Sequence, residues 1–214
     1  MNAILDPMLD PALLHPERAR PLLRREYEQL VELGVFEDER VELLRGVLVE
    51  MSPQGEPHAR ISAWFAQHLG KVLAFDRYDV RSHSSFPASE ESMPEPDVTV
   101  THRLPRADPS RPSKALLLIE VCGSSVTKDR VIKTEIYAEA GVPEYWIVDL
   151  RTEAVDVLTQ PGPGGYAKVT RFSRGDVLRP RRLRGIGIAV SSIPWLPYDP
   201  TPSRKQPARP RKRK

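Results

Sequence analysis

Two acidic residues of the chain lie where the sequence predicts buried strands. Asp97 directly follows Pro96 and opens an extended segment, and Glu120 lies near the end of the apolar run that begins at Ala115. A carboxylate that is buried without a partner is costly, so each of these groups requires compensation. A divalent cation would provide it, because Mg²⁺ prefers oxygen ligands, usually one or two carboxylates with water and substrate phosphate. Asp97 and Glu120 therefore predict a metal site at one edge of a sheet.

A positive charge for the same site is predicted to come from Lys133. The alternation of side chains along a strand places residue 122 on the face of Glu120, but the chain has Cys122 there and not a lysine. Lys133 follows on the next predicted helix, on a face shared with Asp129 and Tyr137, from which its ammonium could reach inward. Tyr137 itself is expected to pack in the core. The alternative for Lys133 is an exposed ion pair with Asp129, which would contribute only tenths of a kcal/mol.

The elements that would position these residues follow an α/β pattern. Apolar residues at intervals of three and four predict an amphipathic helix from 58 to 75. The run from 115 to 121 predicts a buried strand, and a helix from 127 to 140 leads from it to a strand at 144–150. The segment 154–158 is expected to be the antiparallel neighbour of that strand. The other expected elements are a peripheral helix at 26–33, short pieces around 41–51 that could be extended or helical, and strands at 79–86, 97–101 and 166–172.

Length and composition favour one soluble domain with an ordinary core. The chain has 214 residues, of which 40% are hydrophobic and 29% are charged. It contains no apolar run long enough to cross a bilayer and no secretion signal, so we expect a cytoplasmic protein without a membrane span. Cys122 is the only cysteine, which excludes an internal disulfide and a cysteine-based zinc cluster. Phosphate-loop, nucleophile-elbow, helix-turn-helix, zinc-finger and RNA-recognition signatures are also missing from the sequence.

The positive charge of the chain is concentrated at its C-terminal end. The formal net charge is +3, yet the segment from Ser203 onward contains no acid, so the rest of the chain is mildly acidic. Such a tail is expected to attract phosphate without sequence preference and in a salt-dependent manner. The equally weighted alternative is a solvated tail that only aids solubility. The basic residues of the tail, which are the candidate nucleic-acid contacts, are Arg204, Lys205, Arg209, Arg211, Lys212, Arg213 and Lys214.

The residues around the predicted site resemble a known family. Pro96-Asp97 followed by Glu120-Val121-Cys122 resembles the PD-(D/E)XK signature of the restriction-endonuclease-like superfamily. The surrounding sequence is similar to the Uma-two family of predicted bacterial restriction endonucleases. The similar segments are RVELLRGVLVEMSP and a following His58, then EPDVTV, LLLIEVCGSS, Asp129, Lys133 and YAEAGVPEYWIVD. The resemblance extends from about Glu26 to Leu158, and the YAEAGVPEYWIVD block makes it specific.

The resemblance implies a fold, an activity and a set of site residues. The implied fold is α/β, a restriction-endonuclease-like mixed β-sheet core flanked by helices, to which an additional antiparallel β region is added. The implied activity is Mg²⁺- or Mn²⁺-dependent cleavage of phosphodiester bonds in DNA by a homodimer. Asp97 and Glu120 would bind the metal, Glu42 is a further candidate ligand, and Lys133 would take the role of the strand lysine from the helix.

The alternative function is a catalytically inactive nucleic-acid-binding or interaction module on the same fold. Along the chain, we expect an N-terminal arm at 1–25, the nuclease-like domain at 26–196 and the basic tail at 197–214.

Overall fold

The apolar run that contains Glu120 forms the central strand of a mixed sheet. In the computed structural model, which describes residues 20–108, 110–123 and 127–197, this strand is β5 (Ala115–Cys122). It pairs antiparallel with β4 (Val98–His102) and parallel with β6 (Glu144–Asp149). Nearly every residue of β5 is buried, because a strand in the middle of a covered sheet is buried on both faces. The predicted buried strand is therefore confirmed.

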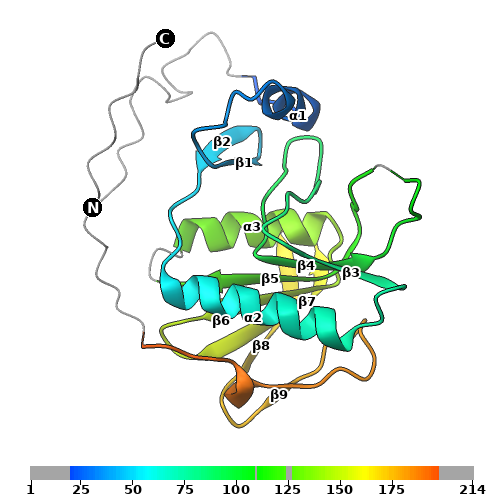
Figure 1. Cartoon of the computed structure of the whole chain (residues 1–214). Coiled ribbons are helices and arrows are strands. Elements are labelled where there is room, and N and C mark those ends of the chain that lie inside the picture. The colour runs from blue at the N-terminus through cyan, green and yellow to red at the C-terminus, as the bar shows by residue number, and fades with distance from the viewer. Residues whose placement is uncertain (1–19, 109, 124–126, 198–214) are drawn as a thin grey trace.

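Three further strands complete a six-stranded sheet of order β3-β4-β5-β6-β7-β8 (Figure 1). β3 (Tyr78–Ser82) is one edge, and it ends earlier than the predicted extended segment 79–86. β7 (Ala154–Gly162) pairs antiparallel with β6 as expected and continues beyond the predicted end at 158. β8 (Gly165–Phe172) forms the other edge. β5 and β6 are the parallel pair of this sheet, and every other neighbouring pair is antiparallel.

Two helices cover the two faces of the sheet (Figure 1). α2 (Glu56–Val72) packs on β3, β4 and β5, where Ile61, Phe65 and Leu69 are fully buried. α3 (Thr127–Glu139) connects the parallel strands β5 and β6 and packs on β7 and β8.

Alternation along β5 sends Leu117, Ile119 and Val121 into the core under α2, whereas Leu118 belongs to the core under α3. Glu120 consequently lies on the α3 face of the sheet.

A helix and a hairpin lie on the α3 side of the sheet (Figure 1). α1 (Arg24–Glu32) is followed by β1 (Val41–Leu44) and β2 (Val47–Glu50), so the segment around 41–51 is extended and not helical. Arg45 and Gly46 both have positive φ, as a tight two-residue hairpin turn requires. β1 also packs on α3. The hairpin thereby brings Glu42, in the middle of β1, close to α3.

The C-terminal part of the described chain closes the core under α2. It consists of β9 (Val177–Leu178), β10 (Ile188–Ala189) and the short helix η3 (Val190–Ser192). These elements and the β1–β2 hairpin are the additional antiparallel region that the sequence predicts. None of the described helices is long and apolar enough to cross a membrane. The predicted division into an arm, a domain and a tail stays a prediction, since residues 1–19 and 198–214 lie outside the described part.

Candidate active site

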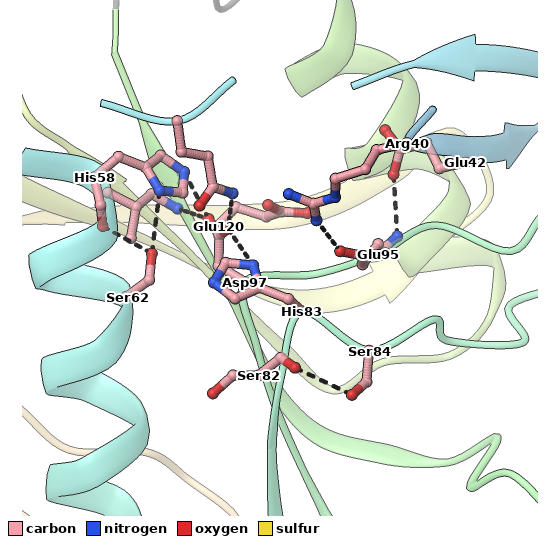
Figure 2. Close-up of polar contacts among 12 residues, drawn as sticks. Arg40, Glu42, His58, Ser62, Ser82, His83, Ser84, Glu95, Asp97 and Glu120 are labelled. Carbon is pink, nitrogen blue, oxygen red and sulfur yellow. Dashed lines mark hydrogen bonds and ion pairs between the residues drawn. The ribbon is translucent and has the colours of Figure 1, made fainter. Parts of the chain in front are cut away.

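Four of the predicted site residues line one cavity of about 280 Å³. Glu42 comes from β1, Asp97 directly precedes β4, Glu120 belongs to β5 and Lys133 to α3. All four are among the buried polar residues of the protein, with Asp97 only 2% exposed. Figure 2 shows Asp97 and Glu120 near the centre, with Glu42 further along beside Arg40 and Glu95. Chain segments that are far apart in sequence therefore bring three carboxylates and one ammonium together.

Lys133 bridges two of the carboxylates. Its Nζ lies 3.0 Å from Glu42 Oε2 and 3.1 Å from Glu120 Oε1. Because Lys133 is only 8% exposed, the alternative of an exposed helix-surface lysine is wrong. Burial alone would lower the pKa of Lys133, but the two glutamates outweigh burial and hold that pKa above its usual value. Lys133 is therefore fixed as a cation at the end of the central strand.

The pKa of Glu120 is shifted by burial and by the charges around it. Burial, together with the nearby charges of Asp97 and Glu42, raises the pKa of Glu120 to about 7, although Lys133 and Tyr137 act in the opposite direction. The Tyr137 hydroxyl donates a hydrogen bond of 2.9 Å to Glu120 Oε1, the same oxygen that faces Lys133. The burial of Tyr137 raises the pKa of its hydroxyl well above the usual value, so it stays a donor. Glu120 is thus a carboxyl group that can exchange a proton near neutral pH.

Asp97 is held by donors on both of its oxygens. The backbone N–H of Val121 donates to Oδ2 at 2.7 Å, and His58 Nε2 lies 3.1 Å from the same oxygen. Gln54 Nε2 donates to Oδ1 at 3.2 Å, and His83 Nδ1 lies 3.4 Å from that oxygen. Figure 2 shows the two histidine rings on different sides of the Asp97 carboxylate. The orientation of this carboxylate is therefore set by four surrounding groups.

Glu42 is tied to the segment that precedes Asp97. The backbone N–H of Glu95 donates to Glu42 Oε2 at 3.0 Å, and the side chain of Glu95 forms an ion pair with Arg40 (Figure 2). Glu42 Oε2 is thus shared between this backbone group and the Lys133 ammonium. Glu42 therefore connects the β1–β2 hairpin to the segment that leads into β4.

Comparison with known proteins identifies the family. The family model described as "Uma2: Putative restriction endonuclease" matches residues 24–191. The chain belongs to this family. A solved structure described as "a putative nuclease belonging to DUF820 from Anabaena variabilis" is similar to this chain with a TM-score of 0.64 and 16% identity. The match covers 81% of this chain and 97% of that chain, and it confirms the predicted mixed sheet flanked by helices. A comparison with curated proteins finds no match.

The sequence segments that resemble the Uma2 family include some of the residues around the cavity but not others. Gln54 and His83 carry no sequence signal for a site, and His58 is named only as part of the family pattern. Tyr137 is buried in the core as expected, but its hydroxyl also serves Glu120. The four-residue spacing of Lys133 and Tyr137 on α3 is the signal that could have identified this second role.

The described residues bear on the predicted metal site but do not include the nucleic-acid contacts predicted for the tail. In residues 20–108, 110–123 and 127–197, no three acidic, histidine or cysteine side chains form a group arranged to hold a metal ion. The tail candidates Arg204, Lys205, Arg209, Arg211, Lys212, Arg213 and Lys214 lie outside the described residues. A metal site in this Uma2 protein would therefore have to rest on fewer protein ligands, a number that is ordinary for Mg²⁺.

Proposed function

We propose that this Uma2 protein is an endonuclease that hydrolyses phosphodiester bonds in DNA with Mg²⁺ or Mn²⁺. The observation that supports the proposal is the convergence of Asp97, Glu120, Glu42 and the Lys133 ammonium on one cavity. Burying four ionisable groups together is expensive, and perturbed acids in a cavity are typical of active sites. The homodimer and the cytoplasmic location implied by the sequence belong to the same proposal.

The donor set fits a hard divalent cation. Its oxygen atoms are carboxylates, which Mg²⁺ and Mn²⁺ prefer, and one or two of them suffice when water and phosphate complete the coordination. The crowding of negative charge that raises the pKa of Glu120 is the situation that a bound cation would relieve. Asp97 and Glu120 would hold the ion, while Glu42, whose Oε2 contacts Lys133 and the backbone of Glu95, would hold the lysine. When bound, the ion would supply activation of a water molecule and neutralisation of the scissile phosphate.

The chain's own groups would then act on the substrate from fixed positions. The Lys133 ammonium is already held at the cavity by Glu42 and Glu120, so it would meet the negative charge that develops on the phosphate oxygens. Glu120 would orient a water molecule through its carboxylate. Asp97, oriented by the hydrogen bonds from Val121 and Gln54, would keep the reacting groups in place.

Cleavage of supercoiled and single-stranded DNA tests the proposal. The parent, Asp97→Asn and Glu120→Gln are compared in the presence of Mg²⁺, Mn²⁺ or a chelator. Asp156→Asn is the matched control, because Asp156 is a carboxylate on β7 that pairs with Arg171 and does not line the cavity. We expect cleavage that requires metal, survives in Asp156→Asn and is lost in the two site variants. Full activity of both site variants would refute the proposal.

One observation favours the alternative of a catalytically inactive binding or interaction module. Each of the three carboxylates already has protein donors, and no group of three metal-ligand side chains occurs in the described residues. Calorimetry with Mn²⁺ separates the two functions. A binding signal in the parent that disappears in Asp97→Asn supports the enzyme, whereas a folded parent that binds DNA but no metal supports the module.

A further inference from the structure

Two histidines contact opposite oxygens of the same buried carboxylate. His58 Nε2 lies 3.1 Å from Asp97 Oδ2, and His83 Nδ1 lies 3.4 Å from Asp97 Oδ1. The rings come from separate parts of the chain, His58 from the first turn of α2 and His83 from the segment after β3 (Figure 2). We propose that His58 and His83 are positioning residues that fix the Asp97 carboxylate relative to Glu120. This inference rests on the proposed function. It concerns two residues to which the proposed function assigns no role.

His58 is itself held in place by a buried serine. Ser62 lies one turn further along α2, is fully buried and belongs to the face of the helix that packs on the sheet. Its hydroxyl donates to the backbone carbonyl of His58 at 2.9 Å, and its Oγ lies 3.3 Å from His58 Nδ1. A polar side chain in an apolar core requires such partners. Ser62 therefore lies against the imidazole, whose Nε2 faces Asp97.

His83 reaches Asp97 from a backbone conformation that residues other than glycine rarely adopt. Its φ is +46°, in the left-handed region, where a side chain costs free energy unless the surroundings impose it. The backbone N–H of His83 donates to the carbonyl of Asp97 at 3.2 Å, which fixes this segment beside the carboxylate. Among the described residues, His83 Nδ1 is buried and has no well-formed hydrogen bond, with Asp97 Oδ1 nearby at 3.4 Å. The backbone of His83 is therefore fixed beside Asp97, with the ring nitrogen near Oδ1.

The neighbouring charge of Glu120 makes the orientation of Asp97 depend on the groups around it. Asp97 and Glu120 repel one another, as the upward effect of Asp97 on the pKa of Glu120 indicates. A carboxylate under repulsion would rotate away from its neighbour unless donors hold both oxygens. Groups that orient a ligand in this way typically change metal affinity or activity about 10–100-fold when they are removed. The two histidines supply that restraint from outside the set of metal-binding candidates.

Substitution of His58 tests the role, with His68 as a matched control on the same helix. His68 stacks on Trp64 with 4.9 Å between ring centroids and does not line the cavity. We expect His58→Ala to lower kcat for DNA cleavage about 10–100-fold with little change in KM, and to weaken Mn²⁺ binding in calorimetry. His58→Gln should recover much of the loss because its amide can donate to Asp97 from the same position on α2. His68→Ala should behave as the parent does.

Two results of this experiment would overturn the inference. One is a His58→Ala variant with the kcat and Mn²⁺ affinity of the parent. The other is a His58→Gln variant as impaired as His58→Ala, which would assign the loss to helix packing and not to the donated hydrogen bond.

Nitrogen NMR of the histidine rings tests the geometry without metal or cleavage. The positioning role requires a proton on His58 Nε2 in the full-length parent, because a carboxylate oxygen accepts hydrogen bonds and does not donate them. We expect its ¹⁵N signal, identified by its loss in His58→Gln, to report a protonated nitrogen and to shift in Asp97→Asn. An unprotonated Nε2, or a signal that Asp97→Asn leaves unchanged, would overturn the inference. Absence of cleavage by the parent would instead refute the endonuclease, and the NMR result would still decide the positioning role.

Discussion

Lys133→Met removes the ammonium of the site while keeping a long apolar stem. In the parent, that ammonium contacts Glu42 and Glu120, whose side chains are 7% and 10% exposed. Removing one partner of a buried ion pair costs about 3–5 kcal/mol, because the other charge stays buried and unpaired. We therefore expect the free energy of unfolding of Lys133→Met to fall by about 3–5 kcal/mol at pH 8.

The same substitution should cost less in acid. Glu120 has a folded-state pKa of about 7 against 4.5 in the unfolded chain, so at pH 5 it takes up a proton and needs no cation. A raised acid pKa means that the neutral form is favoured in the folded protein, and its contribution to stability is lost as pH rises through 7. At pH 5 the expected cost of Lys133→Met is about 1–2 kcal/mol, which leaves mainly the unpaired charge of Glu42.

Urea denaturation followed by tryptophan fluorescence at pH 5 and pH 8, with a chelator present, measures both values. Arg171→Met is the control, because Arg171 is an arginine at an exposed ion pair, for which the expected cost is below about 1 kcal/mol. Adding Glu120→Gln to Lys133→Met should restore part of the stability at pH 8. The reasoning is refuted if Lys133→Met costs no more than Arg171→Met at pH 8, or if its cost is the same at both pH values.

Two further predictions concern one acid of the site and the basic tail. Glu120→Gln should raise the free energy of unfolding at pH 8, by an upper bound of about 3 kcal/mol, and leave it unchanged at pH 4, because the raised pKa of Glu120 penalises only its ionised form. Equal gains in urea denaturation at both pH values would contradict this. Removing the residues after Pro202 should weaken DNA binding and flatten its dependence on salt, by about 0.9 in logarithmic slope for each phosphate that the tail neutralises in the parent. Fluorescence anisotropy over a salt series measures this slope, and an unchanged slope would show that the tail does not touch phosphate.

The centre of the fold could be predicted because its periodicities are strong. The apolar run of β5 and the four-residue repeat of α3 define both elements, and they place Glu120 and Lys133 on facing surfaces. The ends of elements were harder to predict, since β3 stops at Ser82 where the chain turns to bring His83 to Asp97. The pattern of polar and apolar residues before Ser82 does not predict that turn.

The remaining parts of the site depend on tertiary contacts that leave no local pattern. Glu42 reaches Lys133 only because the β1–β2 hairpin packs on α3, and its sequence was compatible with either helix or strand. The positive φ of His83 follows from the contact with Asp97, since histidine has no intrinsic preference strong enough to impose it. Resemblance to a family identified Glu42 as a candidate site residue, whereas no pattern in the sequence identified His83 or Gln54.

The electrostatics of the cavity bear on the choice between an endonuclease and a binding module. Phosphodiester backbones are anionic, and three carboxylates at one cavity repel them. The Lys133 ammonium does not reverse this, because it is already paired with Glu42 and Glu120. This repulsion supports the proposal that a further cation accompanies a DNA phosphate at Asp97 and Glu120. A module that binds DNA without metal must use another surface, and for such a module the buried acids would destabilise the fold without serving the binding. The acidic cavity with its one fixed lysine therefore supports the proposal of metal-dependent chemistry at the scissile phosphate.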